Sequence, residues 1–135
     1  MRALAAAGYR AIGPDMPGYG GEYTDTAVAD RLVRLLDAFG IDRAVLVGHD
    51  SGAPTTWTVA RRHRRRVAGL VLLAVPYAPR PAARATHRAV RGDGPPALPA
   101  HALLGAAGHF AQMERAREVD ELLVNFVSEV ATAHP

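Results

Sequence analysis

A carboxylate and a hydroxyl stand side by side between two glycines in residues 48–52, Gly-His-Asp-Ser-Gly. A strand-like run precedes these residues and a helix-forming segment follows, so they lie at a strand-to-helix turn. A nucleophile at such a turn sits on strained backbone, and the positions two before and two after it must be small because the chain packs tightly there. Glycine fills both positions when the turn is centred on Asp50, whereas centring on Ser51 puts His49 at one of them. The pattern therefore favours Asp50 as a carboxylate nucleophile.

Such a nucleophile forms an ester with an electrophilic carbon, and water must then hydrolyse the ester with the help of a base, usually a histidine. The backbone N–H of Ser51 is the expected oxyanion donor, because the residue after the nucleophile supplies it. Two other interpretations stay open. Ser51 is itself the nucleophile of a serine esterase, or Asp50 and Ser51 only cap the following helix.

Six histidines are candidates for the base. His109 stands in a glycine-flanked loop, after a short apolar stretch and before the last helix. A late loop that delivers the base to the nucleophile agrees with the chain order nucleophile, acid, histidine. His49 adjoins Asp50 and is expected to point elsewhere on the turn. The remaining histidines lie in an arginine run, in irregular segments or at the terminus: His63, His87, His101 and His134.

The elements around these residues alternate between helices and strands. The predicted order is helix, strand, helix, strand, helix, strand over residues 3–7, 9–13, 24–39, 43–47, 54–62 and 67–75. The continuous apolar run at 43–47 predicts a strand that is buried on both faces. Alternation with short connections predicts a parallel sheet, with strand ends and helix starts along one edge, where sites of open α/β sheets lie.

The alternation stops at about residues 77–101, which are rich in Pro, Arg, Ala and Gly and show no clear period. We predict an irregular segment there. Apolar residues at helical spacing then predict a last helix over 115–130. The chain is expected to be one α/β domain, residues 1–135, with a mostly parallel sheet flanked by helices.

Composition excludes several functions. The 135 residues include no cysteine, which excludes disulfides, thiolate metal sites and a cysteine nucleophile. No apolar run reaches the ~18–20 residues of a membrane span, and the N-terminus lacks a signal-peptide pattern, so we expect a cytoplasmic protein that does not bind membranes. Much of the net charge of +3 comes from an arginine run at 61–66. Without a nucleic-acid motif, that run predicts a solvated helix end rather than a nucleic-acid partner.

Four segments of the sequence resemble the α/β-hydrolase superfamily, and most closely its epoxide hydrolases and haloalkane dehalogenases: residues 15–20, 47–52, 71–77 and 108–115. The resemblance covers about residues 1–80 and 102–130 and implies a partial α/β-hydrolase fold without the family's cap domain. It implies that Asp50 forms an alkyl-enzyme ester with a small-molecule substrate. It further implies that His109 activates the water that cleaves the ester, and that no organic cofactor or metal takes part. Asp93, in a Gly-Asp-Gly-Pro run, resembles a shortened acid-bearing loop and is the candidate to orient His109.

The sequence also departs from that family. Its first strands and its His-Gly-x-Pro segment, which carries the second oxyanion donor, have no counterpart. Ser51 stands where dehalogenases often carry tryptophan, and no tyrosine matches the cap positions that polarise an epoxide. Two hypotheses result. The chain is an epoxide-hydrolase-like enzyme, or it is an inactive truncated remnant that self-associates as a homodimer through an exposed sheet edge or apolar helix faces.

Overall fold

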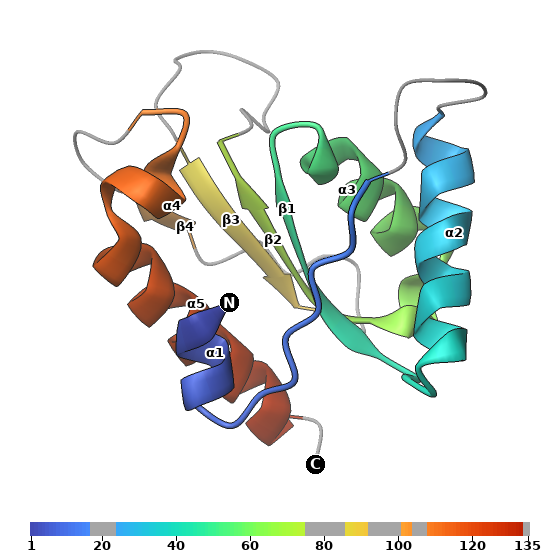
Figure 1. Ribbon diagram of the computed structural model, residues 1–135, viewed down its shortest axis with the longest axis horizontal. Helices are drawn as coiled ribbons and strands as arrows, with labels where there is room; N and C mark the ends of the chain where they lie inside the picture. Colours follow the sequence, from blue (N-terminus) through green and yellow to red (C-terminus); the bar gives the residue numbers. More distant parts are fainter. Residues whose placement is uncertain (17–23, 75–85, 92–100, 104–107, 134–135) are drawn as a thin grey trace.

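The computed structural model describes residues 1–16, 24–74, 86–91, 101–103 and 108–133 (Figure 1). Its four strands form one sheet in the order β1-β2-β3-β4. Helices lie on both faces of this sheet (Figure 1). In chain order the elements are α1 (Arg2–Ala6), α2 (Asp25–Ala38), β1 (Ala44–His49), α3 (Gly52–Arg62), the 3-10 turn η1 (Arg64–Arg66), β2 (Val67–Leu73), β3 (Thr86–Arg91), β4 (His101–Leu103), α4 (Ala111–Glu114) and α5 (Ala116–Ala133).

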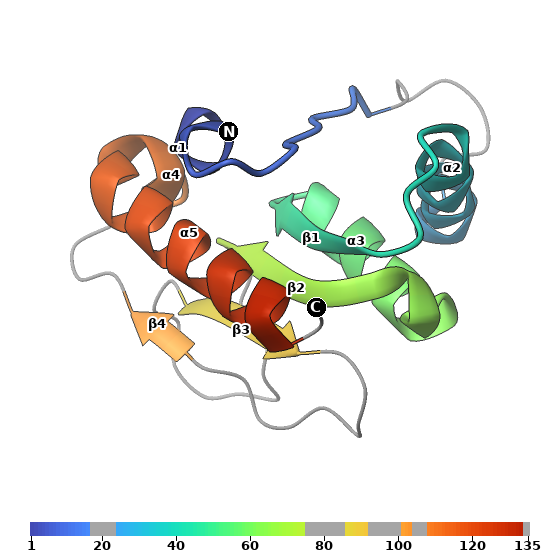
Figure 2. The ribbon, with the colours of Figure 1, turned by 90° about the horizontal axis from the view of Figure 1, so that it is seen from below.

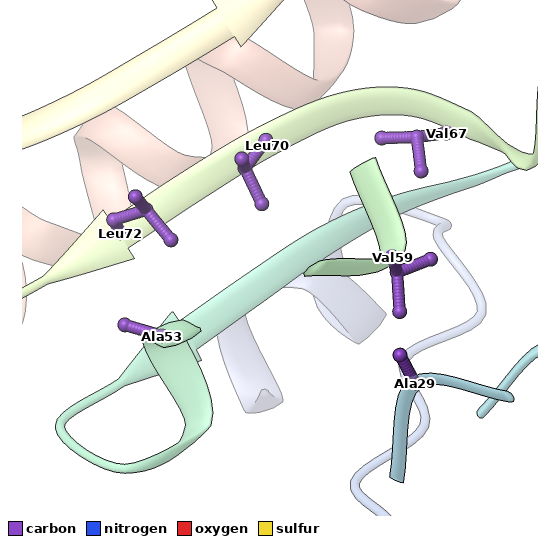
Figure 3. Close-up of a cluster of buried hydrophobic side chains, with 6 residues drawn as sticks. All are labelled: Ala29, Ala53, Val59, Val67, Leu70 and Leu72. Atoms are coloured by element: carbon purple, nitrogen blue, oxygen red, sulfur yellow. The ribbon is translucent and has the colours of Figure 1, made fainter. Parts of the chain in front are cut away.

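Strand β2 contributes side chains from its two faces to two hydrophobic clusters. One face of β2 packs against α3 and, beyond it, α2, and Figure 3 shows the buried residues of this cluster: Ala29, Ala53, Val59, Val67, Leu70 and Leu72. The other face packs against α5, with a cluster of Val71, Leu73, Phe126 and Val130. Burial of a large apolar side chain contributes about 1.5–3 kcal/mol, so these clusters hold both helix layers to the strand.

A local irregularity in the pairing of β2 with β1 decides which β2 side chains face α3 and which face α5. Ala44 pairs with Val67, but the next residue, Val45, pairs with Gly69. Ala68 is therefore an extra residue on β2, and an extra residue moves the following side chains to the opposite face. Beyond it, Leu70 and Leu72 face α3, while Val71 and Leu73 face α5. Gly69 also meets α5, because a Cβ there would lie 2.9 Å from Cζ of Phe126.

The C-terminal helix α5 forms the second layer. Figure 2 shows it crossing the sheet over β2 and β3, on the face opposite α3. Its buried residues are Val119, Phe126, Val127 and Val130. Helix α1 packs on α5, and the Tyr9 hydroxyl just beyond α1 donates a hydrogen bond to Oγ of Ser128 at 3.0 Å. The two ends of the chain are therefore joined on one side of the sheet.

The predicted α/β class is confirmed, and so are the helices at 24–39, 54–62 and 115–130 and the strands at 43–47 and 67–75, with ends that differ by a few residues. Thr24 caps α2, since its Oγ1 accepts the Ala27 N–H at 3.1 Å. The strand predicted at 9–13 is wrong, because these residues are not in a strand. A strand needs a neighbour for its backbone donors and acceptors, and the described residues give 9–13 none.

The sheet differs from the predicted one in three ways. Only β1 and β2 are parallel, since β2–β3 and β3–β4 are antiparallel. Strand β3 lies inside the segment at 77–101 that was predicted to be irregular, and its short polar sequence had no apolar run to reveal it. Strand β1 is not buried on both faces, because Val47 is 41% exposed. Among the described strands β1 has one neighbour, β2, so it stands at the edge.

Charged residues connect α2 to the end of α3. Nε2 of His63 lies 2.8 Å from Oδ1 of Asp30 on α2, and Arg62 lies 3.9 Å from the same oxygen. Arg66 binds the loop between α2 and β1 through the carbonyls of Asp42 and Ile41. The arginine run thus includes structural contacts as well as the predicted solvated helix end.

None of the helices in the described ranges has both the length and the apolar character needed to cross a membrane.

The Asp30–His63 pair predicts a pH dependence of stability. The hydrogen bond from His63 is the main cause that holds the pKa of Asp30 below its ordinary value of 3.8, with smaller contributions from nearby arginines. A lowered pKa in the folded state means that the carboxylate stabilises the fold above pH 3.8, and that this contribution is lost as the pH falls below it. The Asp30→Asn substitution should therefore destabilise the protein at pH 6 and have less effect at acidic pH.

Urea unfolding of the wild type and of Asp30→Asn, measured from about pH 6 to pH 3, tests this expectation. The exposed Asp42 is the control position, and Asp42→Asn should show no such trend. A stability difference for Asp30→Asn that is constant over this range would contradict the assignment.

Candidate active site

The turn between β1 and α3 holds Asp50 in an unusual backbone conformation. Its φ is +50°, in the left-handed region that residues other than glycine rarely adopt. Two hydrogen bonds stabilise this turn. The Asp50 N–H donates to the Leu73 carbonyl at 3.4 Å, and the Ala53 N–H donates to the Asp50 carbonyl at 3.0 Å. The turn is thus attached to the ends of β2 and α3, and the Asp50 side chain projects outward with 63% of its surface exposed.

Gly48 is required because α3 approaches β1 closely. A Cβ at this position would lie 2.3 Å from Oγ1 of Thr56, 2.7 Å from the Gly52 carbonyl oxygen and 2.8 Å from Cα of Ala53. Two of these atoms belong to backbone that cannot easily move. A Cβ at Gly52 would meet nothing within 4 Å. The expectation that both glycines of the turn must be small is therefore right for Gly48 and wrong for Gly52, since the close approach occurs on one side only.

His109 lies beside Asp50, as the sequence predicted. Its Nε2 is 3.6 Å from Oδ2 of Asp50, and its side chain is 46% exposed. This separation is longer than a hydrogen bond, but catalytic pairs are often loose when no substrate is bound. In Figure 2 the arrowheads of β1 and β2 point toward the side where α4 lies. The loop before α4 thus brings an imidazole to the carboxyl end of the sheet, where the elbow also lies.

His49 is a site residue that the sequence analysis missed. It was expected to point elsewhere than toward Asp50, and it contacts the His109 loop: its Nε2 lies 2.9 Å from the His109 carbonyl oxygen, and the two imidazole rings are 4.9 Å apart. A carbonyl oxygen only accepts hydrogen bonds, so Nε2 of His49 carries the proton in this contact. Strand alternation could have revealed this orientation, because Val45, Val47 and His49 share one face of β1 and Val45 packs in the α5 cluster.

An aromatic side chain completes the group. The Phe110 ring lies edge-on to His109 at 5.0 Å and is 5.6 Å from His49. Phe110 is itself 51% exposed. The surface around Asp50 and His109 therefore combines two imidazoles with one apolar ring.

The other predicted site residues have different outcomes. Ser51 is exposed and occupies the N-cap of α3, but its side chain makes no capping hydrogen bond, which weakens the interpretation of this pair as a simple cap. Asp93 lies outside the described residues, so the position of the expected acid is not among them. His63 binds Asp30, far along α3 from the elbow. His87 and His101 lie on β3 and β4, and His134 is outside the described residues.

No metal cluster accompanies the pair in the part of the chain that the structure describes. No group of three or more His, Cys, Asp or Glu residues in that part could hold a metal ion. An open depression of about 610 Å³ lies between α1 and α5, lined by Ala3, Arg117, Asp120, Glu121, Val124 and Asn125. Its lining includes neither Asp50 nor His109, so the two features are separate.

Comparison with known proteins identifies the family of the fold. The family described as alpha/beta hydrolase fold matches residues 1–94. An epoxide hydrolase from Caballeronia sordidicola is 44% identical over 88 residues, which cover 59% of this chain and 27% of that protein. Epoxide hydrolases A and B from Mycobacterium tuberculosis are 46% identical over 87 residues and 42% identical over 86 residues, covering 58% of this chain and 27% and 24% of theirs.

The chain thus spans about a quarter of the length of these relatives. No solved structure matches it. The matched family region includes Asp50 but ends before His109. The case for His109 therefore depends on its resemblance and on its distance from Asp50.

The two glycines of the turn give a matched test of the elbow. Gly48→Ala should lower the free energy of unfolding by about 1–3 kcal/mol, because the added methyl collides with backbone. Gly52→Ala should be neutral, or stabilising by about 0.4–1 kcal/mol, because it adds no close contact and reduces the entropy of the unfolded chain. Urea unfolding of both variants measures the difference. Equal effects of the two substitutions would contradict the close packing of α3 against Gly48.

Proposed function

The chain belongs to the alpha/beta hydrolase fold family, and from this membership we propose that it carries the nucleophile and base of an epoxide-hydrolase-like site. In this proposal Asp50 is the nucleophile, His109 the base and the Ser51 backbone N–H an oxyanion donor. The observation that supports it most directly is the 3.6 Å distance between Nε2 of His109 and Oδ2 of Asp50 at a turn with a positive φ. The names of the most similar relatives suggest an epoxide as the substrate class.

The first step is alkylation of Asp50. A carboxylate oxygen attacks one carbon of the epoxide, the C–O bond at that carbon breaks, and its electron pair goes to the epoxide oxygen. That oxygen then takes a proton from water or from an acid. The exposed Asp50 carboxylate is accessible to such a substrate, and the exposed Phe110 ring offers it an apolar contact.

The second step is hydrolysis of the ester. Nε2 of His109 takes a proton from water, and the hydroxide attacks Cγ of Asp50. The Ser51 N–H can stabilise the resulting oxyanion, and no hydrogen bond among the described residues occupies this N–H group. The ester C–O bond then breaks, the departing alkoxide takes the proton from His109, and a diol leaves. Asp50 is then a carboxylic acid with one oxygen from water, and it returns to the carboxylate by releasing its proton to solvent, which balances the proton that the epoxide oxygen took up in the first step.

The geometry favours this route over a serine esterase. The positive φ belongs to Asp50, whereas Ser51 has ordinary helical angles of −61° and −23°. The imidazole of His109 also faces the Asp50 carboxylate. Strain at functional positions is typical of nucleophile turns.

The second candidate is a chain that does not turn over substrate and associates with a second copy of itself. Strand β1 is at the edge of the described sheet, and Val47 on it is 41% exposed. Exposed apolar strand edges pair readily with another strand. In that case we propose that a second copy of this chain pairs with the edge of β1.

Covalent trapping tests the proposed mechanism. The chain is incubated with styrene oxide and analysed by intact mass and peptide mapping. His109→Gln should accumulate an alkyl ester on Asp50, because hydrolysis slows by about 100- to 10,000-fold while alkylation continues. Asp50→Asn should form no adduct. A single turnover in ¹⁸O water should place the label in the Asp50 carboxylate and not in the diol.

Ser51→Ala is the matched control at the neighbouring position. It should keep adduct formation, since only its backbone N–H is used. An adduct on Ser51 from a p-nitrophenyl ester would instead support the serine esterase. Absence of both adduct and turnover, with either compound and from folded wild-type protein, would reject both chemistries.

Edge pairing has its own measurement. If copies of the chain associate through β1, sedimentation equilibrium should show a dimer for the wild type and a monomer for Val47→Lys, because a charge on the exposed strand face disfavours pairing. Leu122→Lys on α5 is the control, since Leu122 is also exposed, at 38%, but lies on a helix. A dimer that persists in Val47→Lys would exclude this edge as the contact.

A further inference from the structure

A carboxylate holds the backbone just before His109. Oε2 of Glu114 accepts the Gly108 N–H at 2.6 Å. A Cβ at Gly108 would lie 3.0 Å from Oε1 of the same carboxylate, so the side chain of Glu114 lies directly against this residue. Hydrogen bonds to an ionised acceptor are shorter and about twice as strong as those between neutral groups. The loop that carries His109 is therefore fixed by a side chain, and not only by its own backbone.

Glu114 can hold the loop because its own position is fixed. It ends the short helix α4, where the Met113 and Glu114 N–H groups donate to the Phe110 carbonyl at 2.8 and 3.0 Å. Ala111, at the start of α4, is fully buried and packs in a cluster with Val119 of α5. The carboxylate thus connects the His109 loop to the hydrophobic core through one turn of helix.

The opposite end of the same segment is held by His49. Its imidazole donates to the His109 carbonyl at 2.9 Å from the end of β1. Glu114 thus binds the Gly108 N–H, and His49 binds the His109 carbonyl. Between these two bonds, the direction of the His109 imidazole toward Asp50 is restricted.

We propose that Glu114 is a positioning residue for His109, which sets the distance from Nε2 to Asp50 by holding the Gly108 N–H. This inference rests on the proposed function for its catalytic consequence. Glycine permits more backbone conformations than other residues, so the loop loses its restraint on the Gly108 side when the carboxylate is removed. His49 alone then holds the segment, and the imidazole moves away from the nucleophile for part of the time.

The test compares Glu114→Ala with Glu114→Gln in the 135-residue chain. The amide oxygen of glutamine can still accept the Gly108 N–H, so Glu114→Gln should keep the loop in place. Glu118→Ala is the matched control, because Glu118 lies four residues beyond Glu114 and pairs with Arg115 at 3.0 Å. Circular dichroism verifies that each variant is folded.

The first measurement does not depend on activity. Nuclear Overhauser contacts between the imidazole protons of His49 and His109 report the 4.9 Å ring separation. These contacts should fall to less than about half in Glu114→Ala, and they should persist in Glu114→Gln and Glu118→Ala. The Gly108 amide resonance should shift upfield in Glu114→Ala as its hydrogen bond is lost.

The second measurement is the rate of each chemical step with styrene oxide. Misplacement of a catalytic group by about 1 Å costs about 100-fold, so hydrolysis of the Asp50 ester should slow by about 10- to 100-fold in Glu114→Ala. Alkylation, which does not use His109 as a base, should change less than about twofold on the same reasoning. Glu114→Gln should restore most of the hydrolysis rate.

The outcomes separate the two proposals. Glu114→Ala that keeps the ring contacts overturns the positioning role, whatever its activity. A wild-type chain that shows neither adduct nor turnover rejects the proposed function, while loss of the ring contacts in Glu114→Ala still supports the positioning role. Loss of the contacts in Glu118→Ala to the same extent would show a general effect of charge on this end of the chain, and would also overturn the proposal.

Discussion

Helix α3 begins so close to the end of β1 that residue 48 has no space for a side-chain carbon. This contact forces the chain to turn within a few residues, and Asp50 takes the positive φ that such a turn demands. The tight turn also directs the Asp50 side chain out of the core. The hydrogen bond from the Asp50 N–H to Leu73 attaches the turn to β2. The site therefore depends on helix–strand packing that excludes every side chain except that of glycine.

His109 reaches the same place through contacts on the other face of the sheet. Phe126 and Val130 of α5 pack against β2, where Gly69 allows close contact. The N-terminal part of α5 in turn packs on Ala111 of α4. Because α4 follows the His109 loop directly, the core contacts of α5 decide where that loop lies. The positions of Asp50 and His109 thus depend on packing against opposite faces of β2.

Both side chains of the pair are substantially exposed, at 63% for Asp50 and 46% for His109. Exposed ion pairs contribute about 0–1 kcal/mol, so the attraction between these groups cannot hold the site together. Backbone restraint takes that role, through the turn at Asp50 and through the bonds from His49 and Glu114. The chain spans about a quarter of its epoxide hydrolase relatives. The core of the elbow is nevertheless formed by contacts within this chain.

Local sequence determined the helices α2, α3 and α5, the strands β1 and β2, and the elbow with Asp50 at its centre, because periodicity and a required glycine act over a few residues. It also identified His109, although only by chain order and resemblance. Tertiary structure alone decided that 9–13 is not a strand, that β3 is antiparallel, that Gly52 is unconstrained, and that His49 and Glu114 hold the His109 loop. Most of those features depend on the surroundings that other segments supply, and the contact of Glu114 with Gly108, six residues apart, depends on how the chain turns between them. A short sequence pattern does not contain that information.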